Sequence, residues 1–104
     1  MLIDVKKDGD VISLKMSSGE ELIGSFVSED ANAYTIDRPV CLGQGPKGGP
    51  ALMPYLMTVS PDRARNLKIN KALVVTTATT DKELADQYTS ALSGIQLAPA
   101  GMKL

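Results

Sequence analysis

The stretch that decides the fold is Val11-Ile-Ser-Leu-Lys-Met-Ser-Ser-Gly-Glu-Glu-Leu-Ile-Gly-Ser-Phe-Val27. Apolar and polar residues alternate at its start, which is typical of a strand with one buried face. A turn signal ending in Gly19 follows, and residues 20–27 predict the returning strand of a hairpin. Gly24 lies in the middle of this second strand, where a missing side chain lets a sheet bend sharply. We therefore expect a strongly bent antiparallel hairpin.

Further short strands are expected on both sides of this hairpin. A turn pair just before it predicts a leading strand over residues 2–5. The β-prone stretches after it are 33–42, 51–60 and 67–77. Pro39 indicates an edge position or a bulge in the first of these stretches, and a polar Asn70-Lys71 corner interrupts the last. Short strands without crossover helices favour a small antiparallel barrel over an α/β sheet.

One helix is predicted near the end of the chain. Thr80 followed by Glu83 is a capping-box pattern, and Gly94 predicts the helix end. The apolar residues that share one helical face are Leu84, Tyr88, Ala91 and Leu92. The expected fold class is therefore mainly β: a small, strongly bent five-stranded antiparallel barrel over residues 1–78, then a C-terminal helix and tail over 79–104.

The composition is that of one soluble globular domain. The chain has 104 residues, of which 43% are hydrophobic and 22% charged. No run approaches the roughly 18 apolar residues of a membrane span. Charged residues near the start argue against a signal peptide, and one cysteine suits a reducing compartment. We therefore expect a cytoplasmic protein without a membrane partner.

Charge is distributed unevenly, although the formal net charge is only -1. Residues 38–71 contain Asp62 as their single acid against the basic residues Arg38, Lys47, Arg63, Arg65, Lys68 and Lys71. Such a segment can present a basic face to nucleic acid, with Arg63 and Arg65 beside a turn as candidate contacts. The alternative is that these charges only solvate loops.

No residue pattern supports catalysis, a metal or a cofactor. The chain has no histidine, the commonest general base and metal ligand. The spacing of Gly43, Gly45 and Gly48 matches a dinucleotide fingerprint, but prolines bracket it and a strand follows instead of a helix. Cys41 lies between apolar residues with no histidine to activate it. We therefore expect a protein that is not an enzyme.

Residues 11–77 resemble the Sm/LSm family, the ring-forming RNA-binding barrels that include bacterial Hfq. The first family motif is represented by Ile12, Leu14, Gly19, Leu22, Gly24, Phe26, Asp30 and Ile36, and the second by Ile69-Asn70-Lys71-Ala72-Leu73-Val74-Val75. Asn70-Lys71 replaces the usual arginine–glycine pair, and the helix follows the barrel instead of preceding it. The pattern is therefore that of a divergent member, similar to the Sm-like proteins of marine bacteriophages; a phage-encoded protein would act in the host cytoplasm.

The resemblance implies a nucleic-acid site where two loops meet around a pore. Its residues are Asp30, Asn32, Tyr34, Asn70 and Lys71. Asparagine amides suit a base edge, Tyr34 suits stacking and Lys71 suits a phosphate. Two alternatives remain open, namely that Tyr34 belongs to the core and that Asn32 only shapes a turn.

The resemblance also implies a homo-oligomeric ring. Apolar, β-prone strands near 51–60 and 71–78 would be edges that neighbouring copies cover. The expected function is binding of single-stranded RNA, or single-stranded DNA, in RNA or DNA processing. The alternative is a structural or assembly protein, such as a phage component, that uses its barrel for protein contacts only.

Overall fold

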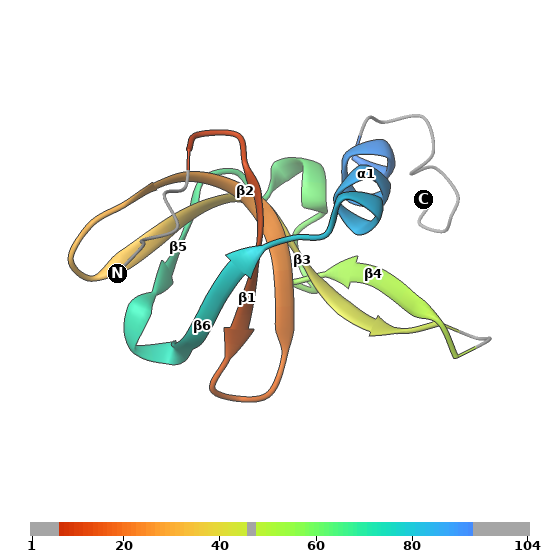
Figure 1. Cartoon of the computed structure of the whole chain (residues 1–104), viewed down its shortest axis with the longest axis horizontal. Coiled ribbons are helices and arrows are strands. Elements are labelled where there is room, and N and C mark those ends of the chain that lie inside the picture. Colours follow the sequence, from red (N-terminus) through yellow and green to blue (C-terminus); the bar gives the residue numbers. More distant parts are fainter. Residues whose placement is uncertain (1–6, 46–47, 93–104) are drawn as a thin grey trace.

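The computed structural model describes residues 7–45 and 48–92, and these form a bent antiparallel sheet with one helix (Figure 1). The strands are β1 (Val11–Met16), β2 (Glu21–Glu29), β3 (Ala33–Gln44), β4 (Pro50–Pro54), β5 (Leu67–Asn70) and β6 (Val74–Thr79). The helices are α1 (Lys82–Ala91) and two single 3₁₀ turns, η1 (Pro61–Arg63) and η2 (Lys71–Leu73). A mainly β fold with a C-terminal helix is thus confirmed, while the predicted strand 2–5 and the helix end at Gly94 lie outside the described residues.

The strands do not form the closed five-stranded barrel that the sequence predicts. Six strands form one sheet in the order β4-β3-β2-β1-β6, and β5 pairs with β3 beside this path. The extra strand arises because η2 divides the stretch 67–77 in two. No ladder joins β5 to β6 within the described residues, so the sheet stays open. Its outer strands are β4 and β6 at the ends of this path, and β5, which pairs with β3 alone among the described strands, forms a third edge.

The fourth strand is also shorter than expected. The sequence predicts a strand over residues 51–60, but β4 ends at Pro54. A bend and a turn follow before η1 begins at Pro61. Proline has no N–H to continue a ladder, which explains why β4 ends there despite the apolar residues that follow.

A close approach of β2 and β3 produces the bend of the sheet. The ladder pairs Ile23 with Val40 and then Ser25 with Asp37, so β3 carries one extra residue opposite Gly24. This is a β-bulge. The sequence predicts either a bulge or an edge position for Pro39, and the structure has the bulge. A Cβ on Gly24 would overlap Ile36 Cγ2 and lie 3.2 Å from Pro39 Cα. The absence of a side chain at position 24 therefore permits the bend.

The core has two parts, one on each side of β2. The main cluster consists of Ile12, Leu14, Met16, Leu22, Phe26, Ile36 and Ile69. A second cluster joins Ile23 and Val40 of the sheet to Tyr88 and Leu92 of the helix. The helical face predicted from the sequence is therefore the face that packs on the sheet.

The helix begins one residue later than the capping-box pattern predicts. Its N-cap is Asp81, which makes no side-chain capping bond. The Thr80 hydroxyl instead forms a 2.8 Å hydrogen bond with Ser13 Oγ of β1. This bond ties the start of the helix to the sheet. Within the described ranges, no helix has the length and apolar character needed to cross a membrane.

Candidate nucleic-acid interface

The predicted site residues lie together at one end of the sheet. Asp30, Asn32 and Tyr34 belong to the β2–β3 turn and the start of β3, and Asn70 and Lys71 form the corner between β5 and η2. The β3–β5 ladder pairs Ala33 with Asn70 and Tyr34 with Ile69. In addition, Lys71 N donates a 2.8 Å hydrogen bond to Asn32 O. The turn and the corner are therefore bonded directly to each other.

Asp30 and Asn70 use side-chain oxygens to shape the backbone. Asp30 Oδ1 accepts hydrogen bonds from the N–H groups of Asn32 at 2.7 Å and Ala33 at 2.8 Å. These bonds hold the pKa of Asp30 below its ordinary value. Asn70 Oδ1 accepts from Ala72 N at 2.8 Å and caps η2. The Asn70 amide nitrogen and the exposed Asn32 side chain take no part in these bonds.

Lys71 is engaged by two neighbours. Its Nζ donates a 2.8 Å hydrogen bond to Glu29 Oε2 and lies 5.0 Å from the centroid of the Tyr34 ring. The bond to Glu29 raises the pKa of Lys71. Glu29 is a residue of this cluster that the sequence did not predict, because residues 29 and 71 become neighbours only through folding. In this conformation Glu29 competes with any phosphate for the Lys71 ammonium.

A second charged cluster lies at the opposite end of the β3–β5 ladder. The ladder ends at the pair Ile36 and Leu67. Just beyond it, the buried Asp37 accepts a 2.7 Å hydrogen bond from Arg65 Nε and a 3.1 Å bond from Asn66 N, both at Oδ1. Arg38 Nε lies 3.6 Å from Asp37 Oδ2. Two guanidinium groups thus share one carboxylate.

Asp37 remains ionised in this cluster. Burial opposes its negative charge, but the bonds from Arg65 and Asn66 and the charges of Arg65 and Arg38 outweigh burial, so the pKa of Asp37 is lowered. The sequence showed only that the segment 38–71 is rich in basic residues. It gave no signal that Asp37 binds Arg65, because the two residues are far apart in the chain and meet through the bulge.

The bulge is joined to the helix by Tyr88. Its buried hydroxyl lies 3.0 Å from the carbonyl oxygen of Asp37 and 2.8 Å from that of Arg38, and it donates to these carbonyls. Burial is the main cause that raises the pKa of Tyr88 to about 12. Tyr88 is therefore a neutral donor at any physiological pH.

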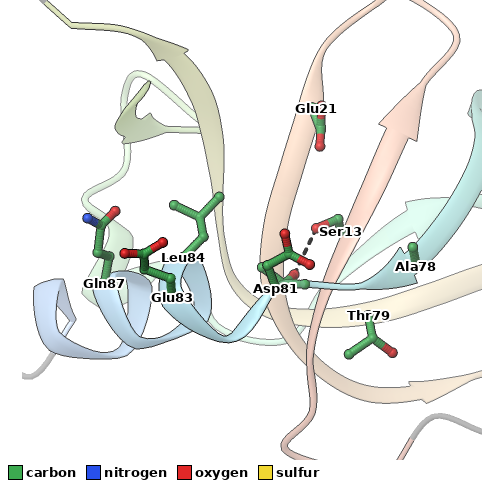
Figure 2. A pocket seen from close by; sticks show the side chains of 9 residues that line it. Ser13, Glu21, Ala78, Thr79, Asp81, Glu83, Leu84 and Gln87 are labelled. Carbon is green, nitrogen blue, oxygen red and sulfur yellow. Dashed lines mark hydrogen bonds between the residues drawn. The ribbon is translucent and has the colours of Figure 1, made fainter. Parts of the chain in front are cut away.

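A cleft of about 570 Å³ lies between the start of α1 and the strands β1, β2 and β6 (Figure 2). Its lining includes the hydrogen-bonded pair Ser13 and Thr80 and the carboxylates of Glu21, Asp81 and Glu83. No basic side chain is among its lining residues. Repulsion from these acids makes the cleft unsuitable for a phosphate. Among the residues described, no group of His, Cys, Asp and Glu side chains is arranged to hold a metal ion.

No known family model matches the chain, and a search of curated proteins finds no match either.

Proposed function

We propose that this chain is a non-catalytic, Sm-like protein that binds single-stranded RNA and assembles into a homo-oligomeric ring. The observation that carries the proposal is the meeting of the β2–β3 turn with the β5–η2 corner. Five residues with suitable chemistry, separated by up to 41 positions in the sequence, lie at this meeting point. Direct hydrogen bonding between Asn32 and Lys71 keeps the two loops in register.

Each group has a distinct part in the proposed binding mode. The amides of Asn32 and Asn70 bond to a base edge, because an amide offers both donors and an acceptor. The Tyr34 ring stacks on the base. Lys71 leaves Glu29 and pairs with a phosphate, which makes binding sensitive to salt. Asp30 contributes by holding the turn that presents Asn32 and Tyr34.

The edges of the sheet support the assembly part of the proposal. β4 and β6 are its outer strands, and each carries exposed apolar side chains, such as Met53 on β4 and Val75 on β6. Unpaired strand edges with apolar residues favour pairing with another chain. Head-to-tail pairing of β4 with β6 of the next copy would cover both edges and, with a suitable rotation, close a ring.

Fluorescence anisotropy with oligouridylate and oligoadenylate at two salt concentrations tests the binding. We expect salt-dependent binding that Lys71→Gln and Asn70→Asp weaken. Asn70→Asp keeps an oxygen to cap Ala72 N but replaces the amide donor with a negative charge. Lys82→Gln is the matched control, since Lys82 pairs with Asp86 at 2.7 Å much as Lys71 pairs with Glu29, but on the helix. Absence of binding at low salt, or equal effects of Lys71→Gln and Lys82→Gln, would contradict the proposal.

A structural or assembly role is the second candidate, and one specific observation favours it. Large apolar side chains are exposed beyond the two edge strands, including Met57, which is 79% exposed, and Leu73, which is 52% exposed. Such residues suit contacts with protein. An oligomer that binds neither oligonucleotide at low salt would support this second function.

A further inference from the structure

The backbone around Asp37 adopts a costly conformation at two neighbouring points. Arg38 has φ of 50° and Asn66 has φ of 52°, and they are the non-glycine residues with positive φ in the described part of the chain. Asparagine tolerates this region, but for arginine it costs about 1–2 kcal/mol. Such strain is found preferentially at functional sites. At Arg38 it accompanies a bulge, a feature that redirects side chains.

The strain brings two arginines to one carboxylate. Arg38 lies on β3 and Arg65 follows η1, yet both approach Asp37. One negative charge is balanced by two positive charges, which leaves the cluster with an excess of one positive charge. Ion pairing needs only one of the two arginines, so structural pairing alone does not explain the second.

The two guanidinium groups retain unused donors. Arg65 contacts Asp37 through Nε, and its Nη groups form no hydrogen bond with the described residues. Its side chain is 57% exposed. Arg38 Nε is buried without a hydrogen-bond acceptor, because 3.6 Å to Asp37 Oδ2 exceeds hydrogen-bond length. Buried unsatisfied donors are rare and costly. Arg65 therefore has exposed donors for an additional anion, and the partly exposed Arg38 side chain brings a second positive charge to the same carboxylate.

We propose that Arg38 and Arg65, held together by Asp37, form a binding site for a phosphate group. Guanidinium groups suit this ligand, because their fork of N–H donors matches phosphate oxygens. We further propose that this phosphate belongs to the bound single-stranded RNA. Another nucleotide of the same RNA strand would place its base at the Asn70 end of β5. This second statement rests on the proposed function, whereas the phosphate site itself does not.

One short single strand of nucleic acid is long enough to contact both clusters. They lie at opposite ends of the β3–β5 ladder, which runs from the Ala33–Asn70 pair to the Ile36–Leu67 pair. At 3.3 Å per residue this ladder spans roughly 10 Å. A small β domain covers about four or more nucleotides of single strand, which is long enough to reach both ends. The exposed Lys68 lies on β5 between them.

Titration of the protein with inorganic pyrophosphate, without nucleic acid, tests the site. Arginine Nε–Hε resonances are followed by NMR, and we expect saturable shifts for Arg38 and Arg65 but not for Arg63. Arg63 is the matched reference. It is exposed, lies two residues before Arg65 in the same loop, and forms no ion pair with the described residues. Equal shifts of all three arginines, or no shift, would overturn the proposed site.

Anisotropy with oligouridylates of about four and about ten nucleotides tests the second statement. We expect Arg65→Gln to weaken binding of the longer strand about tenfold and to lower its salt slope by about 0.7, the value of one phosphate contact. Arg63→Gln leaves both unchanged. Arg65→Lys keeps a positive charge beside Asp37 and so preserves the fold, but it weakens binding because the fork is lost.

The outcomes separate the two proposals. If pyrophosphate shifts Arg38 and Arg65 while neither oligonucleotide binds the wild-type protein, the proposed function fails and the phosphate site stands. If the oligonucleotides bind but Arg65→Gln and Arg63→Gln behave alike, the shared-strand statement is overturned and the proposed function stands.

Discussion

Gly24 lies opposite the bulge that contains Arg38 and Pro39, at the point where the sheet bends. The glycine removes a side chain from the inside of the bend, and the arginine adopts a left-handed backbone on the opposing strand. The role of Gly24 could be predicted from the sequence, because a glycine within a β-prone run is typical of a bend or a close approach of two backbones. The left-handed backbone of Arg38 could not be predicted, since arginine has no preference for a positive φ.

Gly24→Ala should destabilise the protein by about 1–3 kcal/mol, because the added methyl group would overlap Ile36 and displace β3. Urea denaturation measures this free energy of unfolding. Gly49→Ala is the control, since a Cβ there meets nothing within 4 Å. An equal effect of the two substitutions would mean that the close approach at Gly24 does not constrain the bend.

Tyr88 should make the stability fall at high pH. Its folded pKa of about 12 exceeds the value of about 10 for an unfolded tyrosine. The folded state therefore holds this proton more tightly, so the stability that the Tyr88 hydroxyl contributes is fully present below pH 10. The free energy of unfolding then decreases by roughly 1–3 kcal/mol as the pH rises from 10 through 12. Denaturation curves across this range measure the loss. Tyr88→Phe should lack it and Tyr55→Phe should retain it; a loss of the same size in Tyr88→Phe would contradict the assignment.

The β2–β3 turn and the η2 corner were partly predictable from the sequence. The resemblance to the Sm/LSm family implied that the loops carrying Asp30, Asn32, Tyr34, Asn70 and Lys71 would meet, and the ladder between β3 and β5 brings these residues together. The ion pair of Lys71 with Glu29 could not be predicted. A salt bridge between distant residues depends on register and rotamer, and composition reveals neither.

Glu29→Gln and Lys71→Gln should change RNA binding in opposite directions. Glu29→Gln removes the anion that holds Lys71 and repels phosphates, so we expect binding to tighten several-fold and the salt slope to rise. Anisotropy at two salt concentrations measures both quantities. Glu83→Gln on the helix serves as control for the change in net charge. Weaker binding by Glu29→Gln would show that Lys71 does not bind phosphate.

At the scale of the whole molecule, the bent antiparallel sheet could be predicted, whereas its openness could not. Alternation of apolar residues specifies which faces are buried, and the same faces are buried in an open sheet and in a closed barrel. A closed barrel would need β5 to continue into β6 as one strand. The 3₁₀ turn η2, which Asn70 caps, interrupts the chain between these two strands. Pro54 likewise leaves β4 short. Single polar and proline residues, such as Asn70 and Pro54, thus determine where strands end and whether the sheet closes, which hydrophobic periodicity does not specify.

Val75→Glu should reduce the size of the oligomer. Val75 is 66% exposed on the outer strand β6, and a charge there disfavours pairing with another copy. Native mass spectrometry at micromolar concentration compares the species present. Thr89→Glu, which adds the same charge on the exposed side of α1, should leave the mass unchanged. A wild-type protein that is monomeric under these conditions would rule out the ring.

The hydroxyl of Tyr88 connects helix α1 to the cluster of Arg38, Arg65 and Asp37. This hydroxyl bonds to the carbonyls of Asp37 and Arg38, so undocking of α1 would break both of these hydrogen bonds to the bulge. Binding of an anion at the proposed site would therefore be coupled to local opening of the helix. By linkage, we expect an anion at the proposed site to slow hydrogen exchange of the amides in α1.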